Sequence, residues 1–268
     1  MKKIVSVLLA LVMVLTAFVG CGTDKDVTSS GEAVADSDYV KANGKLVVGI
    51  TDFAPMDYKD AEGKWIGFDA DMATAFAKSL GVEVEFVEIN WDNKIMELDG
   101  KKIDCVWNGM TLTDEVKSSM ATSNPYFNNA QVVVVKKDKA DQYKTAEACK
   151  SLSFAVEAGS AGKDQAVANA FSYTEVVDQA TALSEAKSGT SDAAIVDFLM
   201  AISMTGEGTG YADLTYTAKL NSEEYGVGFR KGSDLAEKLN EFFKTSYADG
   251  SMKTTADKYG IAEQLIAQ

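Results

Sequence analysis

Short apolar runs alternate along this chain with stretches whose apolar residues recur at helical spacing. Residues 46–50 form an apolar run typical of a buried strand, and residues 68–80 carry apolar side chains every three or four positions before Gly81. Residues 82–86 alternate strictly between apolar and polar, and residues 103–107, apolar except for Asp104, predict a strand again after a short helical stretch. This order of strands and helices predicts a doubly wound parallel sheet.

A second run of the same kind follows. It predicts strands at residues 132–135, 152–156, 173–177 and 193–196, with helices at residues 164–170 and up to Lys187. The later strand at residues 225–229 and the helix from Leu235 to Phe243 have no obvious place in that second sheet, so we expect them to return to the first. The fold class is therefore α/β with two doubly wound lobes. We expect lobe one at residues 44–130 plus 224–268 and lobe two at residues 131–223.

The first 20 residues are typical of a secretory signal peptide. Two lysines precede an apolar run at residues 4–18, whose 15 residues are fewer than the roughly 18 needed to cross a bilayer. The run ends in Phe18-Val19-Gly20-Cys21, which resembles the lipobox of bacterial lipoproteins, although Phe18 stands where Leu is usual. In a lipobox the cysteine is lipidated and becomes the new N-terminus. An ordinary signal peptide cleaved nearby, with Cys21 incidental, is the alternative.

Residues 21–43 are expected to be the lipidated cysteine and a flexible tether. The stretch is rich in Gly, Ser, Asp and Thr and nearly free of large apolar side chains, so it cannot bury enough surface to order itself. We therefore expect an extracytoplasmic protein, anchored by lipid to the outer face of the bacterial cytoplasmic membrane, at the cell surface or in the periplasm.

The composition excludes several classes of function. The 26 Lys and Arg residues against 40 Asp and Glu give a formal net charge of −14, whose field repels phosphate backbones, so we expect no nucleic-acid partner. The chain has no histidine, which removes Ser-His-Asp and Cys-His catalysis and every metal site that needs imidazole. We expect no catalytic residue, no metal and no cofactor. Cys105 and Cys149 lie in apolar surroundings in different lobes, so both should be free thiols.

Polar and aromatic residues follow the predicted strands. Ligands of such sheets bind outside the carboxyl ends of the strands, where side chains and helix N-termini converge. Two aromatic rings, several hydroxyl or backbone donors and the carboxylates of Asp52, Glu157 and Asp197 would face one crevice, which suits a small polar ligand with a cationic group. The segments are Thr51-Asp52-Phe53, Asn90-Trp91-Asp92, residues 108–111, residues 157–162 and Asp197.

Five motifs in order resemble the polar amino-acid solute-binding lipoproteins of ABC importers, the family 3 extracellular solute-binding proteins. The resemblance runs from about Gly44 to Gln268. It implies a type II periplasmic-binding-protein-like fold, in which two crossover strands join two lobes that close on an amino acid or a related small amine. It also implies a monomer that delivers its ligand to the membrane subunits of an ABC permease. The motifs are residues 46–52, 67–71, 109–115, 157–160 and 192–197.

The resemblance assigns roles to the residues of lobe one. Asp52 is placed at the amino or side-chain group of the ligand, with Phe53 nearby. Trp91 falls on an aromatic wall that excludes water and can stack on a ligand or hold a cation. Core packing is the alternative role for Trp91. Asn108 faces the crevice, and Gly109 would offer its carbonyl to the α-ammonium group.

The resemblance also assigns the two charged ends of the ligand. Thr111 would give its hydroxyl and amide to the α-carboxylate. Asp197 would complete the ammonium site as the counter-charge from lobe two. Capping of the helix that follows is the alternative role for Asp197.

One position departs from the family pattern. The family normally has an arginine clamp for the α-carboxylate where this chain has Val116, and Arg230, the only arginine, lies far away in the sequence. Carboxylate binding would then depend on Thr111, Ser160 and the amides of Ser160 and Ala161 at a helix start.

Glu157 falls where family members vary with the side chain of the ligand. With Asp52 and Asp197 it gives three carboxylates and no clear cation in the crevice. Unpaired buried charge is costly, so we predict a basic or amine-bearing ligand. The alternative is that Glu157 is solvated at the rim of the crevice.

Two further classes of function compete with binding for an importer. A dehydratase on the same fold would use Glu157 as general acid or base. A ligand-sensing lipoprotein would present its ligand state to a receptor. Both remain alternatives at this stage.

Overall fold

The computed structural model describes residues 35–268. The predicted signal peptide and the lipobox cysteine Cys21 lie outside the described residues. Within residues 35–268, no helix combines the length and the apolar character that crossing a bilayer requires.

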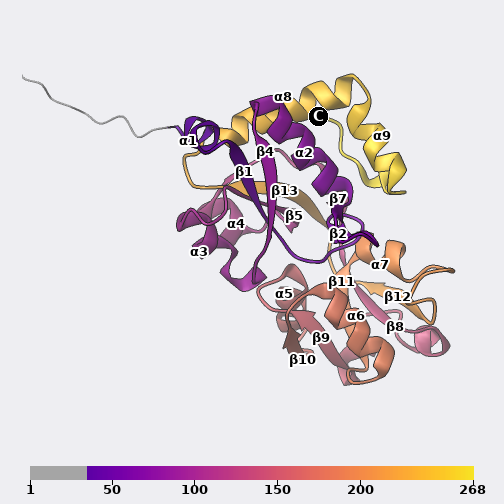
Figure 1. The fold of residues 1–268 in the computed structure, drawn as a ribbon. Coiled ribbons are helices and arrows are strands. Elements are labelled where there is room, and N and C mark those ends of the chain that lie inside the picture. The colour runs from indigo at the N-terminus through magenta and orange to yellow at the C-terminus, as the bar shows by residue number, and fades with distance from the viewer. Residues whose placement is uncertain (1–34) are drawn as a thin grey trace, which may run out of the picture. The chain divides into compact units, whose positions relative to one another are not determined.

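The first sheet takes its strands from both ends of the described chain (Figure 1). Its order is β4-β1-β5-β13-β6, with β1 parallel to β4 and β5, and β13 antiparallel to β5 and β7. The strands are β1 (Lys45–Ile50), β4 (Glu83–Glu88), β5 (Cys105–Thr111), β6 (Ala121–Thr122), β7 (Phe127–Asn129) and β13 (Glu223–Phe229). A separate two-stranded ribbon is formed by β2 (Tyr58–Lys59) and β3 (Trp65–Ile66).

Helices of lobe one flank this sheet. Figure 1 shows α2, α8 and α9 together beside it. Helix α2 ends at Gly81, which adopts the left-handed conformation at φ 79°, as expected for a glycine that stops a helix. The helices are α2 (Phe68–Leu80), α3 (Lys94–Asp99), α4 (Asp114–Ser119), α8 (Leu235–Ala248) and α9 (Ser251–Lys258), with 3₁₀ turns η1 (Trp91–Asn93) and η4 (Ala262–Gln264).

The second sheet has the order β10-β9-β11-β8-β12. Its β9 is parallel to β10 and β11, whereas β8 is antiparallel to β11 and β12. The strands are β8 (Gln131–Lys136), β9 (Ser153–Glu157), β10 (Ser172–Val176), β11 (Ala193–Asp197) and β12 (Leu214–Lys219). The helices are α5 (Ala161–Ala168), α6 (Gln179–Ser188) and α7 (Phe198–Met204), with 3₁₀ turns η2 (Lys137–Gln142) and η3 (Glu147–Ser151).

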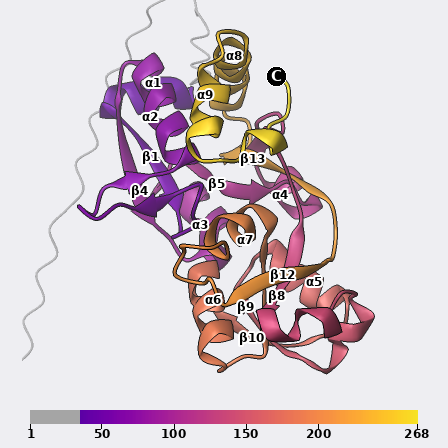
Figure 2. The ribbon, with the colours of Figure 1, turned by 90° about the vertical axis from the view of Figure 1, so that its right-hand side faces the viewer.

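The chain passes between the two sheets twice, from β7 to β8 and from β12 to β13. Figure 2 shows the second crossing as a continuous segment that rises from β12 into β13. Because β13 pairs with β5, it belongs to the first sheet and not the second. The fold class predicted from the sequence, two α/β lobes joined by two crossovers, is confirmed. The limits of the two lobes stay a prediction.

The expectation of a flexible tether up to residue 43 is wrong for its last part. Residues Asp36–Asn43 form helix α1, with Val40 fully buried. Arg230 donates from Nε to Asp36 Oδ2 at 2.9 Å, and Ser37 donates from its backbone N–H to Asp234 Oδ1 at 2.9 Å. These partners lie almost 200 residues away in the sequence, so the composition of the segment alone could not show that it is ordered.

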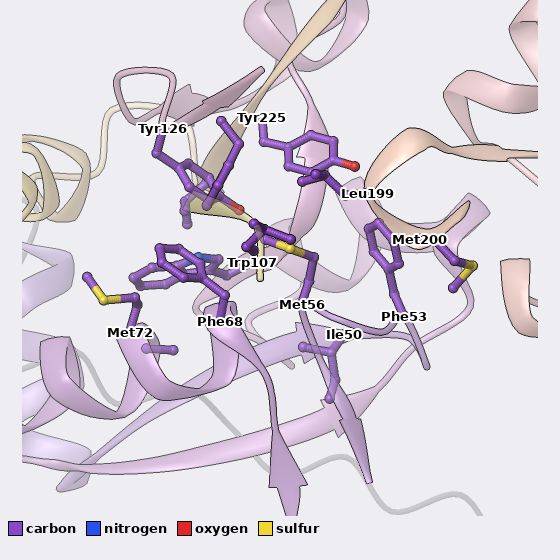
Figure 3. Close-up of a cluster of buried hydrophobic side chains, with 14 of the residues drawn as sticks. Ile50, Phe53, Met56, Phe68, Met72, Trp107, Tyr126, Leu199, Met200 and Tyr225 are labelled. Atoms are coloured by element: carbon purple, nitrogen blue, oxygen red, sulfur yellow. The ribbon is translucent and has the colours of Figure 1, made fainter. Parts of the chain in front are cut away.

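A cluster of buried aromatic and apolar side chains fills the interior and reaches the lobe boundary (Figure 3). Phe68 packs edge-on to Phe127 with ring centroids 4.8 Å apart, and Phe53 packs edge-on to Tyr225 at 6.3 Å. Figure 3 shows Met200 of α7 beside Phe53. The core therefore holds the residues after β1 and the start of β13 in fixed positions, and both lie next to the site described below.

The thiols of Cys105 and Cys149 are both buried and free. Cys105 begins β5 of the first sheet, whereas Cys149 lies in the 3₁₀ turn η3 just before β9 of the second sheet. The prediction of two free thiols is confirmed. Burial raises the pKa of the Cys105 thiol well above its usual range, which disfavours the reactive thiolate.

Candidate functional site

A cavity of about 30 Å³ lies where the carboxyl end of β5 faces the ends of β9 and β11. Nine of the ten ligand-binding residues predicted from the sequence line it, although their roles toward a ligand stay a prediction. The volume is about that of one water molecule, so binding of an amino acid requires the lobes or side chains to move apart. The nine are Phe53, Trp91, Asn108, Gly109, Thr111, Glu157, Ser160, Ala161 and Asp197.

Asp52 is the predicted residue that does not line this cavity. Thr51 and Phe53 are buried, whereas Asp52 between them is exposed to solvent. Partial burial raises the pKa of Asp52, and the charges of Asp178 and Glu88 raise it further. The placement of Asp52 beside the ligand is therefore not supported by the geometry.

Asn108 holds the end of β5 against the end of β1. Its Oδ1 accepts hydrogen bonds from the backbone N–H and the hydroxyl of Thr51, at 3.0 and 2.8 Å. Its Nδ2 donates to the Thr51 carbonyl at 3.1 Å and to Asp57 Oδ2 at 2.8 Å. With these bonds made, Asn108 positions the crevice wall and has little capacity left for a ligand.

Gly109 needs to be glycine for two reasons. Its φ of 54° is left-handed, and a Cβ atom here would lie 2.4 Å from Cε1 of Phe53. Its N–H donates to Asp69 Oδ2 at 2.7 Å, and the same oxygen accepts from the Tyr126 hydroxyl at 2.8 Å. Burial raises the pKa of Asp69 to about 7. The buried carboxyl of Asp69 therefore fixes the backbone of Gly109 beside the Phe53 ring.

Asp197 is the most strongly hydrogen-bonded carboxylate of the cavity. Its Oδ1 accepts from the Tyr225 hydroxyl at 2.7 Å and from Asn129 Nδ2, and its Oδ2 accepts from Gln179 Nε2. The side chain makes no capping hydrogen bond to α7, which excludes the alternative role. Burial raises the pKa of Asp197 to about 7, and the charge of Glu223 acts in the same direction.

The raised pKa of Asp197 predicts opposite pH dependences for binding and for stability. A cation needs the ionised carboxylate, so the affinity for an ammonium ligand should rise on the order of 10-fold between about pH 6 and pH 8. In the unfolded chain this carboxyl titrates near pH 3.9. Between about pH 4 and pH 7 the folded apo-protein therefore binds more protons than the unfolded chain does. Its free energy of unfolding falls as pH rises through this range. Calorimetric titrations and apo melting temperatures across this range measure both slopes. An affinity that is flat with pH would contradict this assignment.

Glu157 is buried in the cavity and is 3% exposed. Its Oε1 has no hydrogen-bond partner among the described residues. Burial raises the pKa of this carboxyl well above its usual range, and the charges of Asp197 and Asp178 raise it further. The alternative of a solvated position at the rim is excluded. An unpartnered buried carboxyl oxygen is an open acceptor for a ligand donor.

The hydroxyls of Thr111 and Ser160 already have partners. Thr111 Oγ1 donates to Glu223 Oε1 at 3.0 Å. Ser160 Oγ donates to the Glu157 carbonyl at 2.8 Å and accepts from the Lys163 N–H at 3.1 Å, so it is the N-cap of α5. A carboxylate at this place would therefore meet the free first-turn amides of α5 more readily than the Ser160 hydroxyl.

Trp91 both packs in the core of lobe one and lines the cavity. It lies in a buried apolar cluster with Val116, Ile103 and Met110. Trp91 can therefore pack in the core and also form an aromatic wall of the cavity. Val116 is buried in the same wall and presents no charge to the cavity.

The expectation of a crevice without a cation is wrong, because Lys94 lines the cavity. It was missed although it lies three residues after Trp91, a spacing that places both side chains on one face of a helical turn. Seven other lining residues were not among the ten predicted ligand-binding residues, and two of them are acidic. They are Met110, Thr113, Glu115, Val116, Gly159, Asp164 and Gln179.

A second, larger cavity of about 420 Å³ lies beside the first, toward the strands that cross between the lobes. Thr111, Thr113, Ala161 and Asp164 line both cavities. Glu223 lines the second cavity and accepts hydrogen bonds from Thr111, Asn129 and Gln131. The first cavity differs in two respects. Phe53 and Trp91 give it aromatic walls, and Oε1 of Glu157 is a buried carboxyl oxygen without a hydrogen-bond partner among the described residues.

Known proteins resemble this chain in both sequence and fold. Residues 46–262 match the family "Bacterial extracellular solute-binding proteins, family 3". The L-cystine-binding protein TcyJ of Escherichia coli K12 is 30% identical over 224 residues, which cover 82% of this chain and 84% of that protein.

Two solved structures extend the comparison. An arginine-bound mutant of ArgBP from T. maritima is 35% identical, with a TM-score of 0.72, covering 76% of this chain and 97% of the other. An ancestral amino acid-binding protein, described as a precursor of cyclohexadienyl dehydratase, is 33% identical with a TM-score of 0.76, covering 83% of this chain and 98% of the other.

Proposed function

Because this chain belongs to the bacterial extracellular solute-binding proteins of family 3, we propose that its cleft binds an amino acid with a cationic or hydrogen-donating side chain. The protein is a solute-binding subunit of an ABC importer. The α-ammonium group would meet Asp197 and the Gly109 carbonyl, and the α-carboxylate would lie at the start of α5. Phe53 and Trp91 would form the aromatic walls.

This proposal depends on one observation, the lack of a hydrogen-bond partner for Oε1 of Glu157 among the described residues. A buried carboxyl oxygen without a partner is destabilising unless a ligand donor reaches it. Asp197, Glu115 and Asp164 line the same cavity, so four acidic side chains face one small ligand. The relatives named above, which bind cystine and arginine, support an amino acid as the ligand class.

A ranking of ligands tests the proposal. L-arginine, L-lysine and L-ornithine should bind at least about 10-fold more tightly than L-glutamate and L-aspartate, whose second carboxylate would face Glu157. Glu157→Gln should reduce that preference. A thermal-shift screen across amino acids, polyamines and quaternary amines, followed by calorimetric titration, gives the ranking. Tight binding of L-glutamate by the unmodified protein would contradict the proposed side-chain chemistry, and no response to any compound would contradict the binding function itself.

We propose that the ligand leaves this site chemically unchanged. The buried Glu157, whose pKa is raised, is the group that a dehydratase on this fold would use as general acid or base. One relative is described as a precursor of such an enzyme. Mass spectrometry of the ligand after prolonged incubation distinguishes the two functions, because conversion to a dehydrated product would reveal catalysis.

The remaining expectations from the sequence complete the proposal. Residues 1–20 would be a signal peptide, and Cys21 would carry the lipid that anchors a monomer to the outer face of the cytoplasmic membrane. The tether would end near α1, before the lobes at residues 44–130 plus 224–268 and 131–223. The permease subunits of the importer would receive the ligand. Membrane fractionation of Cys21→Ala, which should release the protein, tests the anchor.

A further inference from the structure

Lys94 is the one basic side chain that lines the 30 Å³ cavity in the part of the chain that the structure describes. It opens helix α3 of lobe one and is 8% exposed. Its Nζ lies 5.1 Å from the centroid of the Trp91 ring. Burying an ammonium group is costly unless the charge is paired, so its presence requires an explanation.

The hydrogen bonds of Lys94 leave one donor open. Nζ donates to the Gly159 carbonyl of lobe two at 2.9 Å and to the Trp91 carbonyl at 3.3 Å. An ammonium group has three N–H donors, so one remains. Among the described residues no carboxylate oxygen lies within 4.0 Å of Nζ, although Glu115, Glu157 and Asp164 are near enough for their charges to act on it. Lys94 is therefore a buried cation without an ion pair in this part of the chain.

The first turn of α5 faces the same cavity from lobe two. Ser160 caps the helix by accepting from the Lys163 N–H, which leaves the N–H groups of Ala161 and Gly162 without an acceptor inside the helix. Such amides favour an anion. The Gly159 carbonyl holds Lys94 next to this turn, so a cation and two free amides converge from opposite lobes.

We infer that Lys94 receives the carboxylate of the bound amino acid, together with the first-turn amides of α5. This inference rests on the proposed function. Val116 is apolar and cannot provide that charge, and Thr111 already donates its hydroxyl to Glu223. A carboxylate held between Lys94 and α5 contacts both lobes at once, so it stabilises their closed arrangement. The ligand class is thereby narrowed to compounds with a free carboxylate.

Paired ligands test this role. The affinities of L-arginine, L-lysine and L-ornithine are compared with those of agmatine, cadaverine and putrescine, the same compounds without the carboxylate. Calorimetric titrations use the unmodified protein, Lys94→Met, Lys94→Arg and the control Lys117→Met. Lys117 is an exposed lysine on the neighbouring helix α4, so its removal changes the local field by the same charge.

Lys94→Met should weaken binding of the amino acids on the order of 10- to 100-fold, while the affinity for the matching amines stays the same or rises. Lys94→Arg should restore part of the loss, and Lys117→Met should change the affinity by less than about 2-fold. Methionine replaces a buried charge with a side chain of similar length, so the variant should fold.

Four results would overturn the inference. If Lys94→Met binds the amino acids as tightly as the unmodified protein, Lys94 does not hold the carboxylate, although the binding function stands. If Lys94→Met weakens amino acids and amines equally, Lys94 acts on the fold or closure of the cleft and not on the carboxylate. If the unmodified protein binds the amines but no free amino acid, the carboxylate site itself is excluded. Binding of neither class would remove the proposed function as well.

Discussion

Asp197→Asn is expected to weaken binding of the proposed cationic amino acid by about 100-fold or more, because it removes the buried charge that we propose for the α-ammonium site. The carboxylate is held ready by Tyr225, Asn129 and Gln179, whose hydrogen bonds orient both oxygens. An asparagine fills the same space but presents an N–H₂ group to donors that need an acceptor. Calorimetric titration with the best ligand of the screen measures the loss.

Asp138→Asn is the matched control for this prediction, because Asp138 is an exposed aspartate in η2. It should leave the affinity unchanged. Circular dichroism and the melting temperature establish that both variants are folded. Unchanged affinity in folded Asp197→Asn would place the ammonium site elsewhere in the cleft.

Arg230→Met is expected to lower the free energy of unfolding by about 3 to 5 kcal/mol, since it leaves the buried carboxylate of Asp104 and the half-buried carboxylate of Asp36 without their partner. Arg230 donates from Nη2 to Asp104 Oδ1 at 3.0 Å and from Nη1 to the Ile103 carbonyl at 2.8 Å. Its Nε pairs with Asp36 of α1, so one guanidinium joins three separate segments of lobe one. At about 2 to 4 °C per kcal/mol for a domain of this size, the melting temperature should fall by roughly 6 to 20 °C.

The surface pair Lys253–Asp257, with N–O distance 2.7 Å, provides the comparison. Both side chains are more than half exposed, so Lys253→Met should shift the melting temperature by no more than about 2 °C. Differential scanning calorimetry of the three proteins gives the values. Equally small shifts in melting temperature for both variants would mean that the ion pairs and hydrogen bonds of Arg230 contribute to the specificity of the fold and not to its stability.

The strands and their order along the chain were largely predictable from the sequence. The mostly apolar stretches at residues 46–50 and 103–107 predicted β1 and the first part of β5, because a buried strand is rich in apolar side chains. Strand β12 (Leu214–Lys219) was not predicted. It pairs with only β8, so much of it is exposed and its apolar pattern is weak.

The candidate site was predictable to the extent that it depends on strand ends. Glu157 and Asp197 end two parallel strands of the second sheet, so they lie at one edge of it, and Gly109 lies near the end of β5 in the first sheet, across the same cavity. Asp52 meets the same rule and still points into solvent. The direction of a side chain in a short irregular segment depends on its neighbours in space, here Asn108 and Asp57, which hold Thr51 and Phe53 inward.

The sequence by itself determined the two lobes, the strand ends that form the crevice and the family, because each follows from periodicity or from motifs within a short stretch of chain. Only the tertiary structure decided that the crevice contains a basic side chain, Lys94, and that residues 36–43 are ordered as helix α1. Lys94 meets the Gly159 carbonyl 65 residues away, and Asp36 meets Arg230 194 residues away. The free energy of a buried charge is set by such distant partners and by desolvation, and neither is encoded in the local pattern around the residue.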